Sequence, residues 1–345
     1  MLSVRWTSSM VAGGLLALGC GSSDESSSGG NGAQGGSGGS TASGGSTATG
    51  GSGGSGGSSA TGGAGGGGGN TAAQCFADIS DGPSTIDYDQ FAPVINSSCS
   101  GTNHQQIEGV EQIVYLGDSI TNGDFVSPKY VDSLTPQLTQ KFPGATVKDC
   151  SEGGARNDDF LMGGNQIPTC FPDGGDSLRT LVVMTMGGND LAAMAKDHIS
   201  LDLAMQAADV MLQQLRDAVV WLKDPAKFPN GSFVVFSNVY EYTDGSANLS
   251  SCPAASIAGF SGSWPEGMPV LPYINEGYMK IAVDTQSDMI FMFESFCGHG
   301  FANTDSSLQC YRGPDTPQYF DFTCIHPNAE GANVITTLFF NTISE

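Results

Sequence analysis

Basic side chains are scarce in this chain. Its 345 residues include 12 Lys and Arg against 35 Asp and Glu, and the formal net charge is −23. Proteins that bind nucleic acid, and those drawn to anionic membrane surfaces, need clustered cationic side chains. The composition therefore argues against a nucleic-acid partner and predicts that the acidity mainly keeps the protein soluble.

The sequence also lacks the usual marks of a metal protein. It has no C-x-x-C pair and only four histidines. Structural zinc sites are built from closely spaced cysteine and histidine ligands. We therefore expect neither a metal nor any other cofactor.

The apolar run near the N-terminus is too short to cross a bilayer, which takes roughly 20 apolar residues. Arg5 precedes the run Val11–Leu18, the arrangement of an export signal over residues 1–19. The ending Ala17-Leu18-Gly19-Cys20 resembles a bacterial lipobox, which implies cleavage before Cys20 and lipidation of this cysteine. We expect a protein of the cell envelope, lipid-anchored and facing the periplasm or the cell surface. The alternative is an ordinary cleaved signal and a secreted protein.

A tract of Gly, Ser, Thr and Ala follows the signal. Residues 20–72 cannot bury enough apolar surface to fold, so we expect a disordered linker. A flexible chain of about 50 residues spans on the order of 40 Å. Residues 73–345 remain for one domain, in which residues 73–110 form an N-terminal extension.

The cysteines agree with export. There are nine, and setting Cys20 aside leaves eight, an even number that suits disulfides in an oxidising compartment. Eight cysteines allow 105 connectivities. We predict pairing in chain order, as Cys75–Cys99, Cys150–Cys170, Cys252–Cys297 and Cys310–Cys324.

The folded part alternates strand-like and helix-like segments. Short runs rich in Val, Ile, Met and Phe predict five buried strands, over 112–116, 145–148, 181–186, 232–239 and 288–292. Apolar residues at helical spacing predict helices over 128–141, 202–223, 273–285 and 329–343. This alternation predicts a three-layer α/β domain, with a mostly parallel five-stranded sheet and helices on both faces. We expect a monomer, with its functional residues just after strands.

Four short segments carry residues that suit nucleophilic chemistry. Gly117-Asp118-Ser119 follows the first predicted strand, where a serine hydroxyl can be presented at the sheet edge. The second segment is Ser151–Arg156, with a glycine pair, and the third is Gly187–Asp190, where Asn189 can donate to a developing negative charge. The fourth is Cys324–Asn328, whose His326 can take the serine proton. Taken singly, each signal is weak: the first three segments also fit ordinary turns, and a lone histidine is more often a structural residue.

The other three histidines compete with His326 for the role of base. They are His104, His198 and His299. His299, in Cys297-Gly298-His299-Gly300, is the strongest rival, because His104 lies outside the sheet region.

The ordered set of four segments resembles the SGNH, or GDSL-type, hydrolase family over residues 111–345. The resemblance implies a flavodoxin-like sheet and an esterase or lipase-like activity without cofactor. It makes Ser119 the nucleophile and His326 the base. The oxyanion hole would consist of the N–H groups of Ser119 and Gly154 and the Asn189 amide. Gly153 takes the place of Gly154 if the glycine block is offset by one residue.

The fourth segment departs from the family pattern. The residue three before His326 is Thr323, where the family has aspartate, and the nearest acid is Asp321. Two arrangements stay open: the loop bulges so that Asp321 reaches the histidine, or a backbone carbonyl orients the ring. We favour Asp321 as the third catalytic residue, since the acid mainly fixes the tautomer and orientation of the imidazole.

The substrate is an ester of a small molecule or of a polymer, and its class stays open. Two long segments, 241–272 and 294–322, contain aromatic residues that can line an acyl pocket, stack on a sugar or fill loop cores: Phe260, Trp264, Phe301, Tyr311, Tyr319 and Phe320. We predict a carboxylic ester hydrolase. The alternatives are a carbohydrate acetyl esterase acting on polysaccharide and a non-catalytic binding lipoprotein of the cell surface.

Overall fold

The computed structural model describes residues 100–123 and 128–345. The predicted signal peptide, Cys20, the linker and most of the extension over 73–110 lie outside these residues. The same holds for the predicted Cys75–Cys99 pair. In the described part of the chain, no helix is both long and apolar enough to span a membrane.

Five parallel strands form one sheet, as predicted, in the order β2-β1-β3-β4-β5. The strands are β1 (Gln112–Gly117), β2 (Thr146–Asp149), β3 (Thr180–Thr185), β4 (Ser232–Ser237) and β5 (Asp288–Ile290). The central strands β1 and β3 are buried along their whole length, which explains their nearly unbroken apolar sequences.

The two edges of the sheet differ. The prediction of a buried second strand is wrong, because β2 lies at an edge and three of its four residues are exposed. Strand β5 lies at the other edge but is buried. The chain segment that precedes β1 covers it: Thr102 N–H donates to Met289 O at 2.9 Å, and Phe291 N–H donates to Ser100 O at 2.9 Å.

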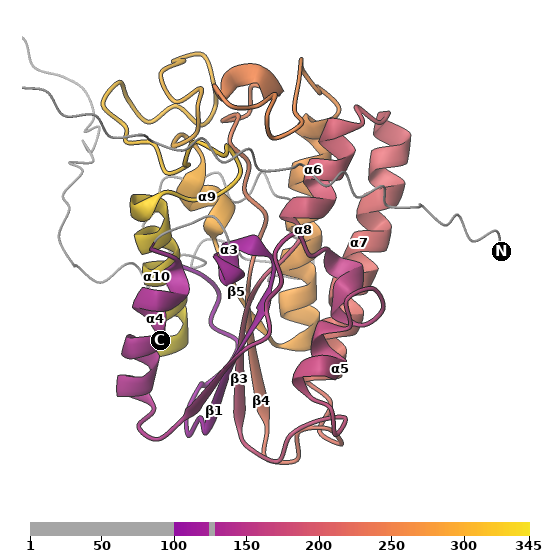
Figure 1. Ribbon diagram of the computed structural model, residues 1–345, viewed down its shortest axis with the longest axis vertical. Coiled ribbons are helices and arrows are strands. Elements are labelled where there is room, and N and C mark those ends of the chain that lie inside the picture. Colours follow the sequence, from indigo (N-terminus) through magenta and orange to yellow (C-terminus); the bar gives the residue numbers. More distant parts are fainter. Residues whose placement is uncertain (1–99, 124–127) are drawn as a thin grey trace, which may run out of the picture. The chain divides into compact units, whose positions relative to one another are not determined.

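Helices cover both faces of the sheet (Figure 1), which confirms the three-layer prediction. One face carries α4 (Tyr130–Lys141) and α10 (Ala329–Ser344); the other carries α6 (Gly188–Lys196), α7 (Leu201–Leu222) and α8 (Gly267–Thr285). Helices α4, α7, α8 and α10 were predicted, although α8 begins six residues earlier than expected. Helix α6 was not predicted. Short elements complete the set: α3 (Ser119–Asn122), η3 (Asn157–Phe160), α5 (Gln166–Cys170), η4 (Leu249–Ser251) and α9 (Met292–Phe296).

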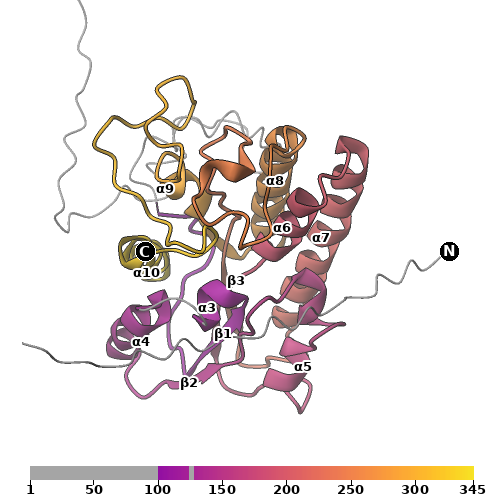
Figure 2. The same ribbon diagram turned by 45° about the horizontal axis from the view of Figure 1, so that its top comes forward.

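The strand order creates a switch point between β1 and β3. From β1 the chain continues to β2 on one side, and it then returns to place β3 on the other side of β1. In such sheets, ligands bind outside the carboxyl ends of the strands at this point. The segments that follow β4 and β5 gather beyond the same ends of the strands, in orange and yellow (Figures 1 and 2).

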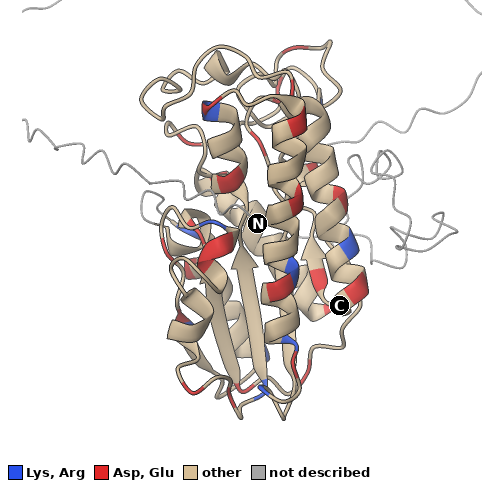
Figure 3. Ribbon diagram, turned by 90° about the vertical axis from the view of Figure 1, so that its right-hand side faces the viewer, with Lys and Arg blue, Asp and Glu red and all other residues tan. Residues whose placement is uncertain are grey.

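Charged side chains are spread thinly over the domain. On the face shown in Figure 3, acidic residues are scattered along the helices and loops, and few basic residues lie between them. Such a distribution offers no concentrated cationic surface for a polyanion.

Candidate active site

Ser119 lies at the end of β1 and begins the short helix α3. The Asp118 carboxylate caps this turn, because its Oδ1 accepts from Ile120 N–H at 3.0 Å and from the Thr185 hydroxyl at 2.9 Å. Gly117 has φ 130°, and a Cβ there would lie 2.2 Å from Thr185 O. Only glycine fits this close approach of two strand ends, so the turn that carries the serine is tightly fixed.

His326 lies against this serine although 207 residues separate them in sequence. Its Nε2 is 2.8 Å from Ser119 Oγ, and the two residues are 5% and 7% exposed. A serine and a histidine at hydrogen-bonding distance are the first requirement for an activated nucleophile. The fold therefore brings the two residues together at the rim of the sheet, as the sequence predicted.

The other ring nitrogen of His326 contacts a hydroxyl group. Its Nδ1 lies 2.7 Å from Thr323 Oγ1, and the same hydroxyl lies 2.5 Å from Asp321 Oδ1. This arrangement differs from both of those considered from the sequence. The group at Nδ1 is a threonine side chain, and Asp321 is bonded to that threonine.

The rival histidines are held elsewhere. His299 Nδ1 lies 2.7 Å from Pro317 O, and its ring stacks on Tyr319 with 3.6 Å between centroids. Burial lowers the pKa of His299 to about 4, so the ring stays neutral within the loop core. His104 Nδ1 lies 2.7 Å from Ser287 O, beside the start of β5, and His198 is an exposed residue after α6.

Asn189 is the second residue of α6 and follows β3 as Ser119 follows β1. Gly187 before it has φ 108°, and a Cβ there would lie 2.2 Å from the Tyr278 hydroxyl. The Asn189 amide donates to Ala155 O at 2.9 Å. An amide carries two N–H donors, and this bond uses one of them. The side chain also lines the same cavity as Ser119.

Gly154 lies in an exposed turn after β2, with φ 79°. Three bonds hold this turn beside the serine: Glu152 N–H donates to Gly117 O at 2.9 Å, the Asn122 amide donates to Ser151 O at 3.0 Å, and the Asn189 amide bonds Ala155. The segment that contains Gly153 and Gly154 is thereby tied to the elements that carry Ser119 and Asn189.

Two acids, the buried Asp118 and the half-buried Asp190, stand next to these polar residues. Burial raises the pKa of the Asp118 carboxyl to about 6, while the bonds from Ile120 and Thr185 oppose the rise. Burial likewise raises the pKa of Asp190 to about 7, opposed by the N–H of Asn157, which donates to its Oδ2 at 3.1 Å. Both carboxyl groups accept hydrogen bonds from backbone N–H groups, and Asp118 also accepts from the Thr185 hydroxyl. These bonds assign the two acids a structural role, in which they hold the turns that carry Ser119 and Asn189.

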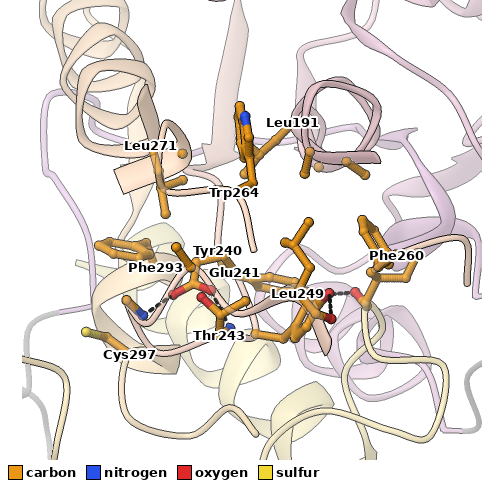
Figure 4. A pocket seen from close by; sticks show the side chains of 18 of the residues that line it. Leu191, Tyr240, Glu241, Thr243, Leu249, Phe260, Trp264, Leu271, Phe293 and Cys297 are labelled. Carbon is orange, nitrogen blue, oxygen red and sulfur yellow. Dashed lines mark hydrogen bonds between the residues drawn. The ribbon is translucent and has the colours of Figure 1, made fainter. Parts of the chain in front are cut away.

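A cavity of about 250 Å³ opens beside Ser119. Figure 4 shows Leu191, Trp264 and Leu271 on one side of it, facing Tyr240, Leu249 and Phe260 on the other. Of the loop aromatics singled out from the sequence, Phe260 and Trp264 line the cavity. Phe301, Tyr319 and Phe320 instead pack among other aromatic rings within the loops.

Four polar side chains around the cavity have partners within the chain. The hydroxyls of Tyr240 and Tyr242 each donate to a backbone carbonyl at 2.8 Å, and the Trp264 indole donates to Ile199 O at 2.9 Å. The Glu241 carboxylate accepts from the N–H groups of Thr243 and Gly245. These side chains therefore present mainly carbon atoms to a ligand in the cavity.

Three disulfides hold the described part of the chain. Cys150–Cys170 is confirmed, whereas the predicted Cys252–Cys297 and Cys310–Cys324 pairs are wrong. The structure pairs Cys252 with Cys324 and Cys297 with Cys310. Cys252–Cys324 joins the segment after β4 to the loop that carries His326, because these two segments fold side by side.

No group of three or more His, Cys, Asp or Glu residues in positions 100–123 and 128–345 is arranged to hold a metal ion.

A sequence profile of GDSL-like lipases and acylhydrolases matches residues 113–339, about two thirds of the chain. The chain belongs to this family. As a GDSL-like lipase/acylhydrolase it is a hydrolase of ester bonds, and the matched region runs from β1 into α10.

Solved structures resemble this GDSL-like hydrolase at low identity. A member of the lipolytic G-D-S-L family from Veillonella parvula is 13% identical, with TM-score 0.44, over 68% of this chain and 98% of that one. Est24, a carbohydrate acetylesterase from Sinorhizobium meliloti, gives the same figures. A gut microbial diltiazem-metabolizing enzyme is 14% identical with TM-score 0.45, over 70% of this chain but only 48% of its own length. No curated protein matches the chain.

Proposed function

We propose that this protein cleaves carboxylic esters through a covalent acyl-enzyme formed on Ser119, with His326 as the base. The observation that supports the proposal most directly is the 2.8 Å distance between Ser119 Oγ and His326 Nε2. Ser119 lines a mainly apolar cavity, and Asn189 lines the same cavity.

In the first half-reaction, His326 Nε2 accepts the Ser119 proton while Oγ attacks the ester carbonyl carbon. The oxyanion is stabilised by the N–H groups of Ser119 and Gly154 and by the Asn189 amide. The tetrahedral intermediate collapses, the carbon–alkoxy bond breaks, and the alcohol leaves with the proton held by His326. Water then gives a proton to His326 as it attacks the acyl-enzyme, and the carboxylic acid departs as Ser119 regains its proton.

The cavity favours an apolar acyl group. Tyr240, Tyr242 and Trp264 turn their polar atoms to backbone partners, so their rings offer little to the hydroxyl groups of a sugar. Each methylene buried there is worth about 0.8 kcal/mol. We infer that esters of medium-length or aromatic acids are cleaved with higher kcat/KM than acetyl esters.

Hydrolysis of p-nitrophenyl esters tests the mechanism. We expect Ser119→Ala to lower kcat by about 10⁴-fold or more, as loss of a nucleophile does in other serine hydrolases. Ser256→Ala, at an exposed position, is the matched control and should equal the wild type. Equal rates for Ser119→Ala and the wild type would overturn the proposal. A fluorophosphonate probe should label the wild type and not Ser119→Ala, and absence of labelling would favour a binding protein without catalysis.

A chain-length series from acetate to decanoate, with acetylated xylo-oligosaccharides as the competing class, tests the acyl preference. Ala192 lines the cavity and Ala193 does not. We expect Ala192→Phe to lower activity on octanoate about tenfold with little effect on acetate, and Ala193→Phe to leave both unchanged. A preference for the acetylated oligosaccharides in the wild type would contradict the acyl assignment and favour a carbohydrate acetyl esterase.

We further propose that the enzyme is exported and anchored through a lipid on Cys20. The support is the signal-like sequence of residues 1–20 and the pairing of all six cysteines of the described part, a usage typical of oxidising compartments. Metabolic labelling with palmitate, compared between wild type and Cys20→Ala, tests this. Labelling of both, or of neither, contradicts the anchor.

A further inference from the structure

The His326 loop is unusual in what it places against the imidazole. Thr323 Oγ1 lies 2.7 Å from His326 Nδ1 and 2.5 Å from Asp321 Oδ1. Asp321 Oδ1 also accepts from the Thr323 N–H at 2.8 Å. One carboxylate oxygen thus holds both the backbone and the side chain of the threonine that contacts the ring.

The hydrogens of this chain of groups can be assigned in one consistent way. A carboxylate can only accept, so the Thr323 hydroxyl donates its single hydrogen to Asp321. The lone pair of Oγ1 is then left to accept from Nδ1–H of His326. With its hydrogen on Nδ1, the ring presents an unprotonated Nε2 to Ser119 Oγ, and this is the tautomer that a general base needs.

We propose that Thr323 is the positioning residue of the base, and that its hydroxyl links the Asp321 carboxylate to His326 in place of a direct contact between acid and imidazole. The inference rests on the proposed function, since it assigns a role only if His326 acts as a base. When the ring becomes positively charged in the reaction, the Thr323 dipole, oriented by Asp321, faces the Nδ1 proton.

The loop is built to hold this geometry. Phe320 and Pro327 form an antiparallel bridge at its neck, and Asp321 N–H donates to His326 O at 2.9 Å. The Tyr240 hydroxyl donates to Ile325 O at 2.8 Å. These bonds fix the ends of a six-residue segment in which the Asp321 side chain folds back onto Thr323.

The competing explanation is that Asp321 and Thr323 only stabilise the turn. The two explanations differ in what a loss of the hydroxyl does to kcat and to KM. A positioning role acts on the base and leaves the acyl cavity intact, so Thr323→Val should lower kcat about 10- to 100-fold with KM unchanged. Thr323→Ser keeps a hydroxyl and should retain kcat within about threefold. Thr337→Val, at an exposed position on α10, is the matched control.

Asp321→Ala sharpens the test. It removes the oxygen that accepts from the Thr323 hydroxyl, so the hydroxyl can turn and donate to Nδ1, which holds the unproductive tautomer. We expect at least a tenfold loss of kcat in this single variant. In the Thr323→Val background the same change should cost almost nothing, because the link is already broken.

The outcomes separate the two proposals. Wild-type kcat in Thr323→Val, or losses in the two single variants that multiply in the double variant, would overturn the role of Thr323. Full activity in Ser119→Ala, measured in the same assay, would instead overturn the proposed function. If thermal unfolding shows that Thr323→Val is not folded, the pair Thr323→Ser and Asp321→Ala decides: loss in the second with retention in the first supports the link, and retention in both contradicts it.

Discussion

The two halves of the active site are held in different ways. Ser119 and Asn189 follow the neighbouring central strands β1 and β3, and the buried Asp118 and crowded glycines fix the turns that carry them. His326 lies on a loop held by a disulfide, a backbone bridge and a tyrosine hydroxyl. Ser119 and Asn189, the proposed nucleophile and oxyanion donor, thus depend on the sheet, whereas the proposed base depends on long-range links between loops.

The first prediction concerns the sheet-held half. Asn189→Ala removes the amide of a residue that lines the cavity, the proposed oxyanion donor, and should lower kcat about 10²- to 10³-fold, the usual cost of one oxyanion-hole donor. Asn333→Ala, exposed on α10, should have no effect. Steady-state kinetics on the preferred p-nitrophenyl ester measures the change. An effect confined to KM would mean that Asn189 binds the ground state and the transition state equally well.

The second prediction contrasts two disulfides. Cys252–Cys324 closes a separation of 72 residues, and its loss should destabilise the fold by about 4 kcal/mol and lower kcat about tenfold, because His326 lies two residues from Cys324. Cys150–Cys170 closes 20 residues and should cost about 3 kcal/mol with kcat unchanged, since other bonds hold the turn after β2.

Double Cys→Ser variants of each pair, assayed well below their melting temperatures and unfolded in urea, provide the measurement. Equal losses of kcat in the two variants would show that the His326 loop depends on its disulfide no more than the turn after β2 does.

The third prediction is the smallest for activity. Burial raises the pKa of Asp190 from its ordinary value of 3.8 to about 7. The folded state therefore holds this proton more tightly than the unfolded state, so the stabilising contribution is complete below about pH 4 and is lost as the pH rises through about 7. Asp190→Asn cannot lose a proton.

The stability of Asp190→Asn relative to the wild type should therefore rise steadily from pH 4 to pH 8, by about 2 kcal/mol or more. The kcat should stay within about threefold. Urea unfolding at several pH values tests this, with the exposed Asp202→Asn as control. A constant difference across this range would show that Asp190 does not titrate as its burial implies.

Much of the fold could be predicted from local pattern. The central strands are nearly unbroken apolar runs, and the segment 201–222 buries residues at three- and four-residue spacing. The secondary structure of these segments therefore follows from their own sequences. Strand β2 was predicted as buried together with the other short apolar runs, but its position at the sheet edge is a property of the topology. Helix α6 was missed because Gly187 and Gly188 suggested a turn, although Ala and Met residues of high helix propensity follow.

In the candidate site, too, some features could be predicted from local sequence and others could not. The positions of Ser119 and Asn189 after their strands were predictable, since both depend on short segments beside glycines. The disulfide pairing was not, because Cys252 and Cys324 meet only once two distant loops have packed. The contact of Thr323 with His326 was also missed. The signal for it was present: a hydroxyl residue stands three positions before the histidine, and a hydroxyl can bond an imidazole as a carboxylate does.

The Cys252–Cys324 bond also has a consequence for when the enzyme becomes active. A newly synthesised chain in a thiol-reducing environment would already have its serine turn folded on the sheet, but the histidine loop would lack its covalent fastening. Esterolysis would reach full rate only after oxidation of this pair. With the proposed export, the producing cell's own esters would meet only the slower, reduced enzyme until the protein had left the compartment in which it was made.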